Sequence, residues 1–382
     1  MRILIALTYY RPHVSGLTIY AERLARGLAR RGHAVTVLTS QFAAALAERE
    51  QVDGVDIVRV PIAMKVSKGV IMPRFLLYAA RCIGRCEVVN VHMPQFEAAL
   101  LSSLGRLRRR GVVLTYQCDL RLPHGTFNRL VEASLQPLNR LAAAAAHAVV
   151  TTSDDYAQHS PFLSRYAGKV RAIAPPIDLP APSEDATARL VARWQLDRGV
   201  HIGFAARFAA EKGVEYLLQA LPAVLDAIPD ARIVFTGAYK DTVGEEDYWQ
   251  RLEPMLERYR HHLVFLELLP AEAMPSFYAL CDVIAVTSLN STEAFGMVQV
   301  EAMLSGTPVV ATDLPGVREA VGRTGMGVIV PPRDPARLAA ALVDVLREPA
   351  RFIRPRGEIL AAFDLERSLR QYEELFASVQ RT

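Results

Sequence analysis

Short apolar runs alternate with amphipathic stretches along the first half of the chain. Runs rich in branched aliphatic residues predict strands at residues 3–7, 34–38, 57–60, 88–91, 112–115 and 148–152. Apolar residues three or four positions apart predict helices at residues 19–31, ended by Gly32, and at residues 96–110, ended by Gly111. Because this alternation is typical of βαβ units, we expect an α/β domain built on a parallel sheet.

The alternation restarts in the second half, after a proline-rich break. Strands are predicted at residues 201–205, 232–236, 263–266, 283–287, 308–311 and 327–330, and helices at 213–228, 247–260, 272–280, 295–305, 315–321 and 335–347. Residues 175–182 hold four prolines, which predicts a stiff linker. We therefore expect one domain at residues 1–175, a linker at 176–186, a second domain at 187–362, and a last amphipathic helix within 363–382.

The composition limits the class of protein. A chain of 382 residues with 51% hydrophobic and 22% charged residues is long enough for two globular domains with separate cores. No uncharged run is long enough to span a bilayer, and the apolar start is better explained by a first strand than by a signal peptide. The four cysteines lack zinc-site spacing, so we expect reduced thiols, no bound metal and a cytoplasmic protein.

Charge is unevenly distributed between the two halves. Residues 1–180 carry 23 Lys or Arg against 12 Asp or Glu, whereas residues 181–382 carry 21 against 28. Arginines cluster on the first predicted helix and at the end of the next, at Arg23, Arg26, Arg30, Arg31 and residues 106–110. No nucleic-acid-binding motif accompanies them, so an anionic membrane surface is the favoured partner. The alternative is that these arginines only face solvent.

The most informative segment joins a predicted buried strand to a predicted helix. Glu293 and Glu301 are eight positions apart, about 800° around a helix at roughly 100° per residue, so both carboxylates are expected on nearly one face. The backbone N–H groups of Phe295, Gly296 and Met297 lie at the predicted start of the helix, where they can bind hydroxyl or phosphate oxygens. Two carboxylates beside a helix N-terminus suit a nucleotide sugar. The alternative is the solvated face of an ordinary amphipathic helix.

Two further loops follow predicted strands. Arg207 and Lys212 lie between a buried strand and a helix, where two cations can neutralise a diphosphate leaving group. Gly16 follows the first strand and allows a backbone to approach a phosphate, although an ordinary tight turn would also explain it. The chain contains no Gly-x-Gly-x-x-Gly, which argues against a dinucleotide enzyme, and no Asp-x-Asp that would hold a divalent metal on a sugar nucleotide.

Polar side chains also follow two strands of the first half. Gln117 comes directly after the strand at 112–115, and His92 ends the strand at 88–91. Side chains at these positions are expected at the carboxyl edge of the sheet, where α/β proteins bind ligands. A single histidine after a strand is more often packed than catalytic, so both interpretations of His92 stay open.

These residues together resemble the retaining glycosyltransferases of family 4, which have the GT-B fold. The resemblance covers essentially the whole chain. It is carried by the Glu-x7-Glu of Glu293 and Glu301, the Gly-x3-Arg-x3-Glu-Lys-Gly block at 203–213, Ser-Gly-Thr-Pro-Val-Val at 305–310, and the opening Ser15-Gly16.

The resemblance implies a role for each position. Arg207 and Lys212 would bind the diphosphate and Glu301 the ribose hydroxyls. Glu293, with the amides that follow it, would bind the sugar hydroxyls. Two Rossmann-like, doubly wound parallel-sheet domains would face each other across a cleft, and the C-terminal helix would cross back to the first domain.

Two positions depart from the family pattern. Gln117 stands where members commonly have histidine beside the sugar; glutamine donates a hydrogen bond but carries no charge. Ala206 stands where glycine often precedes the arginine.

We therefore predict a metal-independent retaining hexosyltransferase that uses no cofactor. We expect a UDP-sugar as the first candidate donor, a GDP-sugar as the second, and a glycan or lipid-linked acceptor. Peripheral contact with the inner face of an anionic membrane is a further expectation. A nucleotide-sugar 2-epimerase and a weakly active sugar-nucleotide-binding protein are the alternatives.

Overall fold

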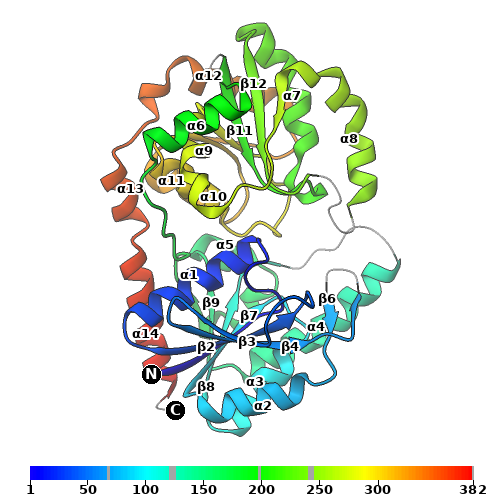
Figure 1. Cartoon of the computed structure of the whole chain (residues 1–382), viewed down its shortest axis with the longest axis vertical. Coiled ribbons are helices and arrows are strands. Elements are labelled where there is room, and N and C mark those ends of the chain that lie inside the picture. The colour runs from blue at the N-terminus through cyan, green and yellow to red at the C-terminus, as the bar shows by residue number, and fades with distance from the viewer. Residues whose placement is uncertain (67–68, 120–125, 197–198, 240–244, 381–382) are drawn as a thin grey trace. The chain divides into compact units, whose positions relative to one another are not determined.

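The computed structural model describes residues 1–66, 69–119, 126–196, 199–239 and 245–380, which fold into two units. The first unit contains Met1–Pro176 and the C-terminal segment from Asp364, and the second contains Ile177–Phe363. Each unit is built on a mainly parallel sheet with helices on both faces (Figure 1). The predicted α/β class with two parallel sheets is therefore confirmed.

The first unit has an eight-stranded sheet in the order β10-β9-β8-β7-β1-β2-β4-β3. Its neighbouring strands are parallel except for β3 and β4. The central strands are buried along their length because helices cover both faces. The strands are β1 (Arg2–Ala6), β2 (Ala34–Gln41), β3 (Arg49–Val52), β4 (Val55–Pro61), β7 (Val88–Met93), β8 (Gly111–Tyr116), β9 (Ala148–Thr151) and β10 (Val170–Ala172). A separate antiparallel hairpin pairs β5 (Met64–Val66) with β6 (Gly69–Ile71).

Helices on the two faces of this sheet come from different parts of the chain (Figure 1). On one face, α2 (Phe75–Arg85) and α3 (Ala98–Leu107) contact each other and the central strands, and α4 (Thr126–Ala145) packs beside α3. On the other face, α1 (Gly16–Arg30) packs against α14 (Leu365–Gln380). The short helix α5 (Asp154–His159) packs near β9 and β10.

The C-terminal helix α14 belongs to the first unit because its side chains fit closely against α1. A Cβ atom at Gly27 would lie 2.6 Å from Leu369 Cδ2, so glycine lets the two helices approach. The hydroxyls of Tyr20 and Tyr372 are hydrogen-bonded at 2.8 Å in the interior. Arg31 also forms ion pairs with two glutamates of α14.

The second unit has a six-stranded parallel sheet in the order β13-β12-β11-β14-β15-β16. Alternate residues of β12 pack into separate apolar clusters, Ile233 into one and Val234 into the other, so both faces are buried. The strands are β11 (Val200–Ala205), β12 (Ala231–Thr236), β13 (Leu263–Phe265), β14 (Val283–Val286), β15 (Val309–Thr312) and β16 (Gly327–Val330). The helices are α6 (Glu184–Trp194), α7 (Val214–Ala227), α8 (Glu246–Arg258), α9 (Met274–Leu280), α10 (Met297–Leu304), α11 (Arg318–Thr324), α12 (Pro335–Arg347) and α13 (Arg356–Ala362).

Every predicted strand is present, with small shifts at its ends, because each carries a buried aliphatic run. The sequence reasoning missed β3, β5, β6 and β10, and the helices α2, α4, α5, α6 and α13. The helix predicted at 315–321 begins only at Arg318 and continues to Thr324. Helix α6 begins at Glu184, capped by Ser183, directly after the proline-rich segment.

Candidate active site

The loop between β14 and α10 carries the predicted glutamate and glycine. Gly296 precedes α10 with φ +73°, and a Cβ there would lie 2.8 Å from Gln299 Nε2, so only glycine fits without strain. Gln299 is fully buried and donates hydrogen bonds to the carbonyls of Phe295 and Val317, both at 2.9 Å. Within the described part of the chain, the backbone N–H groups of Phe295, Gly296 and Met297 donate no hydrogen bond. The loop therefore holds three amides at the start of α10 that a ligand can use.

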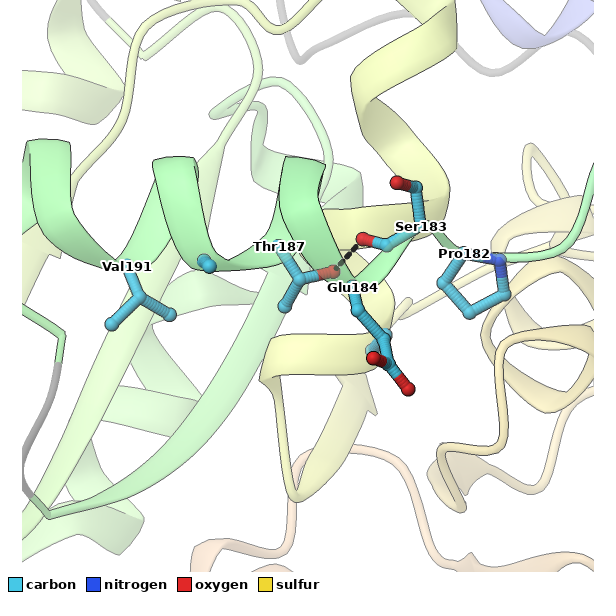
Figure 2. Close-up of a pocket in the computed structure, with 7 residues that line it drawn as sticks. Pro182, Ser183, Glu184, Thr187 and Val191 are labelled. Carbon is cyan, nitrogen blue, oxygen red and sulfur yellow. Dashed lines mark hydrogen bonds between the residues drawn. The ribbon is translucent and has the colours of Figure 1, made fainter.

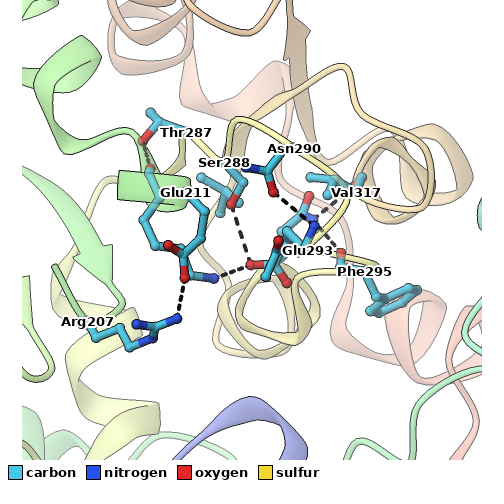
Figure 3. A network of polar contacts seen from close by, with 12 residues as sticks. Arg207, Glu211, Thr287, Ser288, Asn290, Glu293, Phe295 and Val317 are labelled. Atoms are coloured by element: carbon cyan, nitrogen blue, oxygen red, sulfur yellow. Dashed lines mark hydrogen bonds and ion pairs between the residues drawn. The ribbon is translucent and has the colours of Figure 1, made fainter. Parts of the chain in front are cut away.

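The two glutamates of this segment have different surroundings. Glu301 is buried on α10, and the hydroxyl of Tyr278 on α9 donates to its Oε2 at 2.7 Å. The Glu293 side chain is 18% exposed, and its carboxylate forms an ion pair with Lys212 (Figure 3). Ser288 also donates to Glu293, at 3.4 Å. The shared face predicted for the two carboxylates applies only to a continuous helix, and Glu293 lies outside α10.

Arg207 and Lys212 lie in the loop after β11, and each is held by a carboxylate. Arg207 forms an ion pair with Glu211 (Figure 3), and its Nη1 lies 4.0 Å from Glu245 Oε1. The Arg207 side chain is 37% exposed and that of Lys212 22% exposed, so an incoming anion can reach both. Sequence reasoning assigned no role to Glu211 or Glu245, the two partners of Arg207. The four-residue spacing of Arg207 and Glu211 was the available signal.

Backbone contacts join this loop to the end of β14. Thr287 Oγ1 donates to the carbonyl of Lys212 at 2.7 Å, and the Leu289 amide donates to the carbonyl of Glu211 at 2.9 Å. Gly213 has φ +65°, and a Cβ there would lie 2.4 Å from the Thr287 carbonyl oxygen. Because β11 and β14 are neighbours, their carboxyl-end loops meet and bring Arg207, Lys212 and Glu293 together.

The residues predicted in the first unit also lie close to one another. Gln117 is almost buried, and its Nε2 lies 2.8 Å from His92 Nδ1 and donates to the Leu17 carbonyl at 3.4 Å. Gly16 is the first residue of α1, after the capping residue Ser15. Apart from its own helix and chain neighbours, no atom of the described residues lies within 4 Å of the place where a Cβ of Gly16 would be, so space remains beside the first turn.

His92 is a packed residue that holds Gln117. Burial lowers the pKa of His92 to about 3, so its ring is neutral at ordinary pH. Both ring nitrogens face amide nitrogens, Nδ1 that of Gln117 at 2.8 Å and Nε2 that of Asn90 at 3.4 Å. A neutral ring accepts a hydrogen bond at only one nitrogen, and the shorter contact assigns that acceptor to Nδ1, facing Gln117. Asn90 is bonded in turn to Thr115, whose hydroxyl lies 3.2 Å from that of Tyr372. This chain of polar contacts connects α14 to Gln117.

An open pocket of about 410 Å³ lies elsewhere in the second unit, at the start of α6 (Figure 2). It is mostly apolar, and Thr187 there donates to the Ser183 carbonyl at 2.9 Å within the first turn. None of the predicted site residues lines it. The described residues contain no group of three His, Cys, Asp or Glu side chains that could hold a metal ion. No described helix is long and apolar enough to cross a membrane.

Comparison with known proteins identifies the class. Residues 199–348 match the model of the glycosyl transferases group 1, and residues 15–176 match that of the glycosyl transferase 4-like domain. Sucrose-phosphate synthase from Thermosynechococcus elongatus has the same fold, with a TM-score of 0.79 and 22% identity over 99% of this chain and 98% of that one. The Anabaena protein HepE, solved with UDP-glucose, has a TM-score of 0.77 and 21% identity over 99% and 100%. The fold is therefore GT-B, and the protein is a glycosyltransferase.

Two curated glycosyltransferases are similar to this protein along nearly the whole chain. An uncharacterised glycosyltransferase of Methanocaldococcus jannaschii is 27% identical over 371 residues, 91% of this chain and 90% of that protein. The GDP-mannose-dependent alpha-(1-6)-phosphatidylinositol monomannoside mannosyltransferase of Mycolicibacterium smegmatis is 28% identical over 365 residues, with the same coverage. The chain belongs to the group 1 glycosyltransferases, family 4, as its sequence motifs predicted.

Proposed function

We propose that the protein is a metal-independent retaining glycosyltransferase that moves a hexose from a nucleoside diphosphate sugar to a glycan or lipid-linked acceptor. A UDP-sugar is the first candidate donor and a GDP-sugar the second. The observation that carries the proposal is the meeting of Arg207, Lys212 and Glu293 at the carboxyl ends of β11 and β14. Two cations and a carboxylate there match a diphosphate linked to a sugar.

Each side chain has a distinct task in this proposal. Arg207 and Lys212 exchange their carboxylate partners for diphosphate oxygens and stabilise the negative charge that develops when the leaving group departs. Glu301, oriented by Tyr278, accepts hydrogen bonds from the ribose hydroxyls. Glu293 and the free amides before α10 bind sugar hydroxyls. This division supports a donor site within the second unit.

The first unit carries the other residues predicted to bind ligand. Gln117 offers a neutral amide to a sugar hydroxyl, with its orientation set by His92. Gly16 leaves space for a phosphate or sugar beside the first turn of α1. Both residues lie at the carboxyl edge of the first sheet, where ligands bind in this class of fold.

The reaction balances without an enzymic nucleophile. The bond between the anomeric carbon and the diphosphate oxygen breaks, and the acceptor oxygen forms its bond to that carbon on the same face of the sugar. The acceptor hydroxyl proton passes to the departing diphosphate. Arg207 and Lys212 provide the charge stabilisation that a divalent cation gives in other transferases.

The test is release of nucleoside diphosphate from a panel of UDP- and GDP-sugars, with excess chelator and without it. We expect release in chelator, loss of it in Lys212→Ala, and an α-linked product from an α-linked donor, seen by NMR. Arg260→Ala removes a similar exposed charge just after α8, where Arg260 pairs with Glu257, and should remain active. Release that requires added magnesium or manganese, or a product of inverted configuration, would refute the proposed mechanism.

A further inference from the structure

Large apolar side chains stay exposed in one short segment of the first unit. Met64 and Ile71 of the β5–β6 hairpin are 54% and 46% exposed, and Leu76 and Leu77 of α2 are 55% and 49% exposed. Single exposed apolar residues are ordinary on a protein surface. Leu76 and Leu77 are consecutive on α2, and two large exposed apolar side chains on one helix point to an interaction site there.

Helix α2 has two faces of different kinds. Phe75, Ala79 and Ile83 recur every four residues and are buried, and the helix contacts β1 and β2. Leu77 and Arg81 are also four residues apart and lie on the opposite, exposed face. The outward face of α2 therefore combines aliphatic and cationic side chains, as helices that lie in a membrane interface do.

The cations of this face are available to a partner. Arg74, Arg81 and Arg85 are exposed, and none of them forms an ion pair with a carboxylate among the described residues. Residues 64–110 contain nine Lys or Arg but only two acidic residues. Glu87 accepts a hydrogen bond from the Arg2 amide at 2.7 Å, and Glu97 is largely buried. The positive charge of this segment is therefore only weakly compensated.

The end of α3 continues the same surface. Arg108 Nη1 donates to the Ala80 carbonyl of α2 at 2.9 Å, so the two helices are joined at this point. Leu107 beside it is 80% exposed, and Arg109 is also exposed. Figure 1 shows α2 and α3 side by side under the first sheet.

We propose that the α2 surface, formed by Arg74, Leu76, Leu77, Arg81 and Arg85, docks onto an anionic lipid bilayer. The arginines pair with lipid phosphates while the leucines enter the acyl boundary. A second copy of the chain fits less well, because a twofold contact would place the same uncompensated arginines against each other. A nucleic acid would leave the leucines exposed to water.

The arginines of α1 are a poor alternative for the same role. Arg26 lies near Glu22 and Asp53, and Arg31 pairs with two glutamates of α14. The cationic surface predicted from sequence on α1 is therefore partly neutralised inside the unit, on the opposite face of the sheet from α2.

Docking through α2 favours a lipid-linked acceptor over a free glycan. That step rests on the proposed function, whereas the docking itself does not. A bilayer bound at α2 brings membrane-embedded acceptors to the unit that holds Gln117 and Gly16.

Sedimentation with vesicles tests the docking. The probe is a vesicle of equal parts phosphatidylglycerol and phosphatidylcholine, compared with pure phosphatidylcholine. The wild type should bind only the anionic vesicle at low salt and be largely released near 1 M salt, where the Debye length is about 3 Å. Each cation near an acidic membrane raises the affinity for it about fivefold. Replacing Arg74, Arg81 and Arg85 with Gln should therefore weaken vesicle binding about a hundredfold.

Two further variants separate the effect of the α2 surface from that of net charge, and the apolar from the electrostatic part of vesicle binding. Replacing Arg251 and Arg258 of α8, and Arg260 just after it, with Gln changes net charge equally and should leave vesicle binding intact. Leu76→Ser with Leu77→Ser should remove the part of the binding that resists salt. Equal binding by the α2 and α8 variants would overturn the proposal, as would a self-association that the leucine variant abolishes.

Donor turnover without vesicles keeps the two proposals distinguishable. The α2 variants should release nucleoside diphosphate at the wild-type rate in solution. Absence of vesicle binding with normal turnover refutes only the docking surface. Vesicle binding by a protein that turns over no nucleotide sugar refutes only the proposed function.

Discussion

Removing the Lys212 side chain isolates the proposed leaving-group contact. In the ligand-free protein its ammonium is bound by Glu293, while its backbone carbonyl is held by Thr287. Lys212→Ala deletes the charge but leaves this backbone anchor and the αL turn at Gly213 in place. The change therefore acts on the diphosphate contact and not on the fold of the loop.

The size of the effect follows from the kind of bond. A charge-assisted hydrogen bond contributes about 1.5–3 kcal/mol. At about 1.4 kcal/mol for each factor of ten, the dissociation constant of UDP or GDP should rise about 10- to 150-fold. The partner substitution should act in the opposite direction. Glu293→Gln frees the ammonium from an ion pair of about 1 kcal/mol at most, because both side chains are partly exposed. Nucleoside diphosphate should then bind up to about fivefold more tightly, while turnover falls.

Isothermal titration calorimetry with UDP and GDP measures both effects. Arg260→Ala is the control, since it removes an exposed charge paired with Glu257. An unchanged dissociation constant in Lys212→Ala would refute the contact. Weaker diphosphate binding in Glu293→Gln would show that Glu293 supports the diphosphate and does not compete with it for Lys212.

Substitutions at Glu301, Gln117 and His92 test the roles proposed for the other residues. Glu301→Gln should weaken free nucleoside diphosphate about tenfold, because the ribose would lose a charged acceptor; unchanged binding in the titration would contradict that role. Gln117→Ala should lower turnover in the release assay and Gln117→His should keep or raise it, so a fully active alanine variant would remove Gln117 from the site. Burial lowers the pKa of His92 to about 3, below its ordinary value of 6.5, so the unfolded chain binds the extra proton first as the pH falls. Stability should therefore decline from about pH 6.5 towards pH 3, and His92→Gln should flatten that decline in thermal melts; an identical slope would show that another group titrates.

The sequence alone determined the strands of both sheets other than β3 and β10, the α/β class, and the family. Each strand is a local aliphatic run whose burial on both faces is visible without knowing its neighbours. The loop residues Arg207, Lys212 and Glu293 were also predictable, because polar residues directly after a buried strand lie at the carboxyl edge of a parallel sheet.

Some elements escaped prediction for an equally physical reason. Helix α2 does carry a helical period, because Phe75, Ala79 and Ile83 recur every four residues and are buried, but the helix has only 11 residues, so the signal is short. Helix α4 contains Pro137, which argues locally against a helix, and there tertiary packing outweighs the local signal.

Only the tertiary structure decided which charges pair. Lys212 and Glu293 are 81 positions apart, too far for a local sequence pattern to relate them. Tyr278 reaches Glu301 from a different helix. The bond between His92 and Gln117 requires β7 and β8 to be neighbours. Ion pairs and buried hydrogen bonds depend on distances of a few ångströms between side chains, and those distances are set by the register of the strands and the packing of the helices. Residue types along a chain show which chemistry is available, but the folded structure sets which groups meet.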